Sequence, residues 1–134
     1  LVILLIIMGA VDKFKINFFV GGFHAESFKI FNKGNSLVVQ QSEGPIFPDS
    51  DKRTFIVKEN DWEKFWISLD KCNIWDWEKE YFSEIMDGVQ WELKIVKDEK
   101  RKTVYGSNKF PENFQIFLNA LNRISGLNLE YENF

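Results

Sequence analysis

The acidic segment 76–87 is the part of the sequence whose residue types most readily suggest catalytic or metal-binding chemistry. Its carboxylates belong to Asp76, Glu78, Glu80, Glu84 and Asp87. Paired carboxylates can serve as general acid and base, and clustered carboxylates can bind a cation. The spacing matches no calcium-binding loop, and the glycine that such a loop requires is absent. We therefore expect a solvated acidic loop, while a small hydrolase or transferase that uses this loop stays open as an alternative function.

The basic segment 94–102 carries the opposite charge. Its cationic residues are Lys94, Lys97, Lys100, Arg101 and Lys102. Such a group could bind an anion, but lysine and arginine also keep an exposed hairpin soluble and hinder pairing between sheet edges. We expect this second role for the segment.

Nucleophilic and metal chemistry have few candidates, because the sequence contains one histidine and one cysteine. We expect His24 to be exposed beside a turn. Cys72 follows a predicted helix, whose negative C-terminal end raises the pKa of a thiol, so we expect an inert cysteine. The run Gly106-Ser107-Asn108 precedes another predicted helix but lacks the form of a phosphate-binding loop. The sequence therefore predicts no catalytic residue, no metal site and no cofactor.

Two short segments supply the candidate partner-binding residues. Trp75 and Trp77 lie in one of them, and tryptophan is enriched at the energetically important positions of protein interfaces. We nevertheless expect at least one of the two to pack over the first predicted helix. Gly21, Gly22 and Phe23 form the other segment, which we expect to be a tight turn at one end of the sheet.

The composition narrows the class of protein. The chain has 134 residues, of which 45% are hydrophobic, and this suits one domain with a single core, 1–134. The net charge of −3 disfavours a general nucleic-acid-binding role. A single cysteine excludes an internal disulfide.

Alternating hydrophobic residues predict an antiparallel sheet that begins with a β-meander and ends with a C-terminal hairpin. The turn Lys33-Gly34-Asn35 separates two strands of the meander. The predicted strands are 13–20, 23–31, 36–42, 53–58, 89–96 and 101–105.

Two amphipathic helices are predicted, the first over 60–71 with Asn60 as its N-cap. The second begins with Pro111 in its first turn and ends at Gly126 as a left-handed C-cap. Their hydrophobic stripes are Trp62, Phe65, Trp66 and Leu69 in the first helix, and Phe114, Phe117, Leu118, Leu121 and Ile124 in the second. We expect an α+β fold in which both helices pack on one face of the antiparallel sheet, followed by a loose tail at 127–134.

The apolar residues 1–10 form an N-terminal extension. The run is too short to span a bilayer, which takes about 20 residues, and it lacks the basic start of a signal peptide. Three interpretations stay open: translation begins at Met8, the run is the remnant of a signal or membrane anchor, or it is a buried first strand. The first predicts a cytoplasmic protein, and the second predicts an exported or membrane-associated domain.

The later part of the chain resembles a set of small uncharacterised bacterial α+β proteins. The signature is Trp75-x-Trp77, then Asp87-Gly88-x-x-Trp91-x-Leu93, then Tyr105-Gly106-Ser107-Asn108-x-Phe110-Pro111-x-x-Phe114. The resemblance extends over about residues 53–126. It implies a fold and a bacterial origin, and it carries no known chemistry.

The early hairpin at Gly21-Gly22-Phe23, with the Asp87-Gly88 strand, is more distantly similar to emfourin-type inhibitors of thermolysin-like metallopeptidases. These are small α+β proteins with no catalytic centre. The chain departs from them at Gly22-Phe23-His24-Ala25, where a second glycine would be expected, and in its tryptophan-rich middle. The resemblance implies peptidase inhibition as a narrower function but transfers no inhibitory residue.

These observations together predict a non-catalytic domain that binds another protein. A peptidase is the partner that the resemblance implies. We predict neither an enzyme nor a nucleic-acid-binding protein, and the sequence leaves the oligomeric state open.

Overall fold

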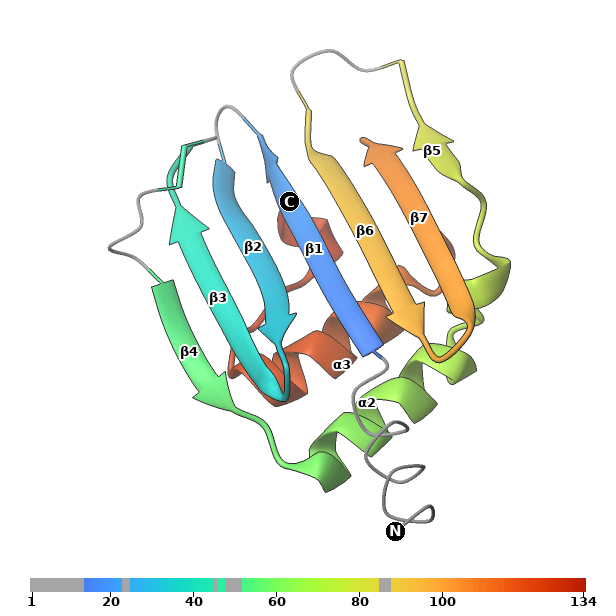
Figure 1. Ribbon diagram of the computed structural model, residues 1–134. Helices are drawn as coiled ribbons and strands as arrows, with labels where there is room; N and C mark the ends of the chain where they lie inside the picture. The colour runs from blue at the N-terminus through green and yellow to red at the C-terminus, as the bar shows by residue number, and fades with distance from the viewer. Residues whose placement is uncertain (1–13, 23–24, 45, 48–51, 85–87) are drawn as a thin grey trace, which may run out of the picture.

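One mixed β-sheet spans the described part of the chain, which in this computed structural model comprises residues 14–22, 25–44, 46–47, 52–84 and 88–134. Seven strands of these residues lie in the order β4-β3-β2-β1-β6-β7-β5 (Figure 1). Their bounds are β1 (Phe14–Gly22), β2 (Ala25–Lys33), β3 (Ser36–Ser42), β4 (Lys52–Ile56), β5 (Glu80–Phe82), β6 (Gln90–Lys97) and β7 (Lys100–Ser107).

The α+β class is confirmed, but the sheet is not wholly antiparallel as predicted. Strand β5 pairs with β7 in parallel, with Glu80 opposite Tyr105, whereas the other neighbouring pairs are antiparallel. The β6–β7 hairpin places β7 between β6 and β5 (Figure 1). Strand β5 therefore pairs with the second strand of the hairpin, which runs in the same direction as β5. A strand of three residues has no measurable alternation, so the hydrophobic pattern could not separate β5 from the loop around it.

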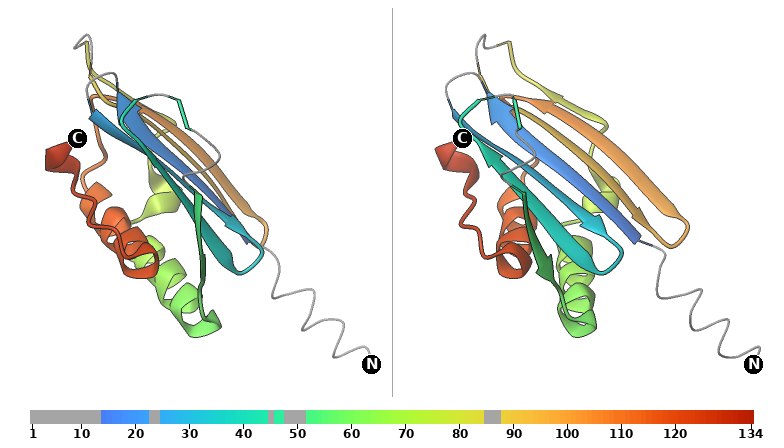
Figure 2. Two further views of the ribbon diagram at one scale, coloured as in Figure 1. Left: turned by 90° about the vertical axis from the view of Figure 1, so that its left-hand side faces the viewer. Right: turned by 60° about the vertical axis from the view of Figure 1, so that its left-hand side comes forward.

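Two helices, α2 (Glu59–Lys71) and α3 (Phe114–Ser125), lie on the same side of the sheet (Figure 2). The ring of Phe18 in β1 contacts Phe117 of α3 at 5.1 Å between centroids, and Phe14 contacts Trp62 of α2 at 4.7 Å. The predicted stripe residues are buried, except that Ile124 is half-buried. Neither helix, nor any other helix in the described ranges, is long and apolar enough to cross a bilayer.

The helix ends agree with the predictions in part. Gly126 adopts a left-handed conformation, with φ 74°, and its N–H donates to the Asn122 carbonyl, so the predicted C-cap of α3 is confirmed. The N-cap of α2 is Lys58, and the predicted cap Asn60 lies inside the first turn. No side chain caps this end, but Glu59 and Asp61 place carboxylates there, which the helix dipole favours.

The C-terminal segment is attached to α3 and does not form the predicted loose tail. Asn122 donates to the Leu129 carbonyl at 2.9 Å and accepts from the Leu129 N–H at 2.7 Å. Gln115 accepts from the Tyr131 N–H at 3.1 Å. Leu129 is 3% exposed and joins the core. A short turn, η3 (Tyr131–Asn133), follows.

Several signature residues of the C-terminal half pack around Trp91. Its indole N–H donates to the Lys109 carbonyl at 2.9 Å, and the ring of Phe110 stacks on it with an interplanar angle of 13°. Gly106 is the direct partner of Trp91 on β7, and a Cβ there would overlap the indole ring. Asn108 binds the backbone of Val89, the residue just before β6. The signature therefore describes how the β6–β7 hairpin is held to α3.

Candidate functional site

The two predicted tryptophans occupy different environments. Trp77 is 6% exposed, donates its N–H to the Cys72 carbonyl at 3.1 Å and contacts Phe117 edge-on. Trp77 is therefore a core residue and does not face a partner in this structure. Trp75 is half-buried in the short helix η2 (Ile74–Asp76) and donates to the Asp70 carboxylate at 3.1 Å. Of the pair, Trp75 keeps an accessible side chain.

The predicted glycine turn is part of a strand. Gly21 and Gly22 belong to β1, with an irregular register between Val20 and Gly22. A Cβ at Gly21 would overlap the Ser27 hydroxyl, and a Cβ at Gly22 would lie 3.0 Å from the Gly88 carbonyl oxygen. Gly21 thus allows β2 to approach closely, and Gly22 does the same for the segment at Gly88, just before β6. Two further candidates, Phe23 and His24, lie outside the described residues.

The acidic segment forms no metal centre in the part that the structure describes. Asp76, Glu78, Glu80 and Glu84 are each exposed, along η2, β5 and the residues beside them. Asp87 lies outside the described residues. Among the described residues, no group of three or more histidine, cysteine, aspartate or glutamate side chains is placed to hold a metal ion.

Cys72 is fully buried at the end of α2. Its thiol donates to the Leu69 carbonyl at 3.2 Å, and burial raises the pKa of the thiol to about 11. The thiol is therefore neutral at physiological pH, and the predicted low reactivity of Cys72 is consistent with this environment.

We expect Cys72 to make the stability of the protein sensitive to alkaline pH. The folded thiol titrates near pH 11 and an unfolded thiol near 9.0, so the stabilisation is complete below pH 9.0 and is lost as the pH rises toward 11. Urea unfolding at pH 8, 9, 10 and 11 should show a steeper loss for the wild type than for Cys72→Ala. Parallel curves for the two proteins would contradict this expectation.

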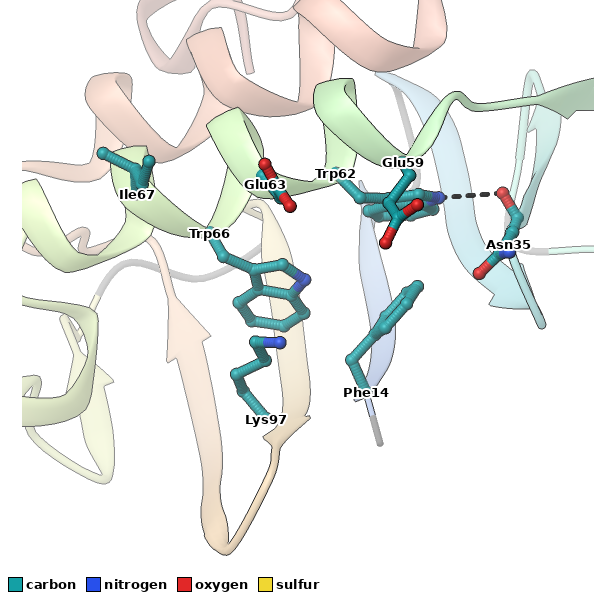
Figure 3. A pocket seen from close by; sticks show the side chains of 8 residues that line it. All are labelled: Phe14, Asn35, Glu59, Trp62, Glu63, Trp66, Ile67 and Lys97. Carbon is teal, nitrogen blue, oxygen red and sulfur yellow. Dashed lines mark hydrogen bonds between the residues drawn. The ribbon is translucent and has the colours of Figure 1, made fainter. Parts of the chain in front are cut away.

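A groove lined by tryptophans runs between α2 and the end of the sheet where β6 turns into β7. It consists of two pockets, of about 380 and 570 Å³, that share Trp66 and Lys97. The first pocket has walls of Phe14, Trp62 and Trp66 (Figure 3). The second continues past Trp75. We call the two pockets together the tryptophan groove.

The sequence of α2 explains why the groove forms there. Trp62 and Trp66 lie four residues apart and so project from the same side of the helix. Trp62 is fixed by its N–H, which donates to the Asn35 carbonyl at 2.8 Å (Figure 3). Phe14, the first residue of β1, contacts both indole rings. The two tryptophans thus belong partly to the core and partly to the wall of the groove.

The indole N–H of Trp66 is a buried hydrogen-bond donor at the groove. The side chain is 7% exposed, and its indole nitrogen has no hydrogen-bond acceptor in the part of the chain that the structure describes. The other four tryptophans each donate their N–H, to Asn35, Asp70, Cys72 and Lys109. A buried donor without an acceptor costs about 1–3 kcal/mol. In Figure 3 the nitrogen of Trp66 lies on the side of the ring that faces Phe14.

The groove is negatively charged along its length. Its carboxylates come from Glu59, Glu63, Asp70, Asp98 and Glu99, and its ammonium groups come from Lys97 and Lys100. Both ammonium groups lie over aromatic rings: Lys97 is 5.8 Å from the centroid of Trp66, and Lys100 is 5.5 Å from that of Trp75. Among the described residues that line the groove, five carboxylates against two ammonium groups favour a cationic ligand.

The sequence pattern predicts other roles for the groove residues. Trp62 and Trp66 fitted the hydrophobic stripe of the first helix, and their burial confirms that role. Lys97 and Lys100 were assigned to a soluble hairpin tip, which does not anticipate their contacts with Trp66 and Trp75. These lysine–tryptophan contacts depend on how the β6–β7 hairpin packs near α2. No local sequence pattern predicts that packing.

The sequence comparisons assign the chain to no known group of proteins. No protein-family model matches it, and no curated protein matches it either. Its function therefore has to be argued from the geometry of the tryptophan groove.

Proposed function

We propose that the protein is a non-catalytic domain that binds another protein through the tryptophan groove. The observation that carries the proposal is the indole N–H of Trp66, which lies buried just behind the wall of the first pocket and lacks an acceptor among the described residues. Buried polar groups in proteins are nearly always paired, so an exception at a pocket wall points to a ligand that supplies the missing acceptor.

The shape and composition of the groove support a protein ligand. A pocket of about 380 Å³ is large enough for one or two side chains but lies at the small end for a cofactor site. Its walls are aromatic, with acidic side chains at the pocket from Glu59 and Glu63. Aromatic residues surrounded by polar ones are typical of the central part of protein interfaces.

Site-specific photo-crosslinking tests this proposal. Ile67 lines the groove and is 54% exposed, whereas Ile116 lies on α3 and is 40% exposed. We expect p-benzoylphenylalanine at position 67 to capture one protein from an extract of the source organism. The same probe at position 116 should capture it at most weakly, and mass spectrometry of the adduct should place the crosslink at position 67.

The captured protein must then bind in purified form. A thermolysin-like peptidase is the first candidate to test, because the early hairpin is similar to emfourin-type inhibitors. Absence of inhibition at micromolar concentration would remove this candidate. Equal capture at positions 67 and 116, or no capture at 67, would contradict binding through the groove.

A further inference from the structure

We infer that the ligand of the tryptophan groove is an extended basic peptide segment. A backbone carbonyl of the segment would accept from the indole N–H of Trp66, and an arginine or lysine side chain would lie in the pocket formed by Phe14, Trp62 and Glu59. This inference rests on the proposed function and names the chemistry of the partner.

Charge complementarity is the first reason. Glu59 and Glu63 line the first pocket, and three further carboxylates line the second. An anionic ligand would meet this charge at short range, where like-charge contacts are costly. The same argument disfavours nucleic acid, because its phosphates would have to approach these carboxylates.

The aromatic walls are the second reason. Cations are attracted to the faces of aromatic rings, most strongly to that of tryptophan. The protein already places its own lysines in this way, with Lys97 over Trp66 and Lys100 over Trp75. In the first pocket, Phe14 and Trp62 contact each other, with ring centroids 4.7 Å apart, and form one wall of a space of about 380 Å³ that can hold a further cation. A planar guanidinium group can stack on such a ring and also bind a carboxylate.

The unpaired N–H of Trp66 is the third reason, and it distinguishes a peptide from a free cation. A donor needs an acceptor, which an organic ammonium ion does not supply. A peptide backbone offers a neutral carbonyl beside a cationic side chain, so one ligand satisfies both the donor and the carboxylates. An extended backbone also keeps its carbonyls free of internal hydrogen bonds.

The probe is a capped pentapeptide with arginine at its centre and valine on both sides. Two control peptides replace the arginine by citrulline, its neutral isostere, or by glutamate. In a ¹H–¹⁵N NMR titration, the indole resonance of Trp66, assigned with Trp66→Phe, should move on addition of the arginine peptide. We expect binding of the citrulline peptide to be about fivefold weaker and binding of the glutamate peptide to be undetectable.

Variants of α2 provide the matched controls. Glu59→Gln and Glu63→Gln should each weaken binding of the arginine peptide by about two- to fivefold, as expected for exposed ion pairs. Asp61→Asn removes the same charge from the same helix, but Asp61 does not line the groove and binding should be unchanged. All three positions are exposed, so none of these variants should disturb the fold.

Three results would overturn the inference. Equal affinity for the arginine and citrulline peptides would exclude recognition of the charge. An unchanged Trp66 resonance would exclude the carbonyl contact. A nuclear Overhauser effect between the Trp66 indole proton and residues 1–13 in the ligand-free protein would show that the chain itself supplies the acceptor. Specific crosslinking at position 67 with no preference for arginine would retain the proposed function while excluding a basic peptide as its ligand.

Discussion

Gly106→Ala is expected to lower the free energy of unfolding by about 3 kcal/mol, at the upper end of what overpacking a core costs. The new methyl group would overlap the indole ring of Trp91, its direct partner across the β6–β7 hairpin. The ring cannot easily move aside, because its N–H is bonded to the Lys109 carbonyl and Tyr81 and Phe110 stack on it. The substitution therefore forces a shift of the strand or of the ring.

Gly44→Ala is the matched control for this prediction. No atom of the residues that the structure describes lies within 4 Å of a Cβ built at Gly44, and we expect a change within about 0.5 kcal/mol. Urea unfolding followed by circular dichroism measures both variants. In the background Trp91→Leu, the cost of Gly106→Ala should shrink, because the smaller side chain leaves room for the methyl group. A Gly106→Ala protein as stable as the wild type would contradict the packing that the structure shows.

The elements with strong periodicity could be predicted from the sequence. The stripe of α2 recurs at i, i+3, i+4 and i+7, and its four residues are buried as the pattern requires. The third strand was predicted at 36–42 and is observed as Ser36–Ser42. In α2 one face is hydrophobic and the other polar, so the sequence alone determines which face is buried. In the third strand the four residues 37–40 are all buried, so the sequence predicted its position but not a single buried face.

Other features depend on contacts that are distant in the sequence. Asn122 and Gln115 resemble solvent-facing positions of a helix, but their amides bind the C-terminal segment. Trp75 and Trp77 are two residues apart, and only the position of α3 decides that Trp77 is the one in the core. A polar side chain that binds a distant backbone has the same sequence pattern as one that binds water.

The candidate site, the tryptophan groove, could likewise be predicted only in part from the sequence. Burial of Trp66 was predictable from the helical stripe, whereas the missing acceptor for its N–H was not. The four other tryptophans find acceptors at distances in sequence between 5 and 27 residues. Whether a buried donor is paired is therefore a property of the complete fold, and functional sites are where pairing is expected to fail.

Asn108 is expected to be the second sensitive position of the signature, and three substitutions separate the effect of its bond to Val89 from that of its backbone conformation. Its side-chain oxygen accepts from the Val89 N–H at 2.7 Å, and its backbone is left-handed, with φ 55°. Asn108→Gly removes the acceptor but tolerates the backbone conformation, so we expect a loss of about 1–2 kcal/mol. Asn108→Ala removes the acceptor and adds about 1 kcal/mol of backbone strain. Asn108→Asp keeps an acceptor and should stay within about 1 kcal/mol of the wild type.

The order of the three variants is more informative than any single value. If backbone strain were the only contribution, Asn108→Gly would be as stable as the wild type. If the hydrogen bond were the only contribution, Asn108→Gly and Asn108→Ala would be equal. The structure predicts that Asp is the most stable of the three and Ala the least, measured by urea unfolding. An Asp variant that is the least stable would contradict this order, because Asp retains the acceptor of the bond from the Val89 N–H.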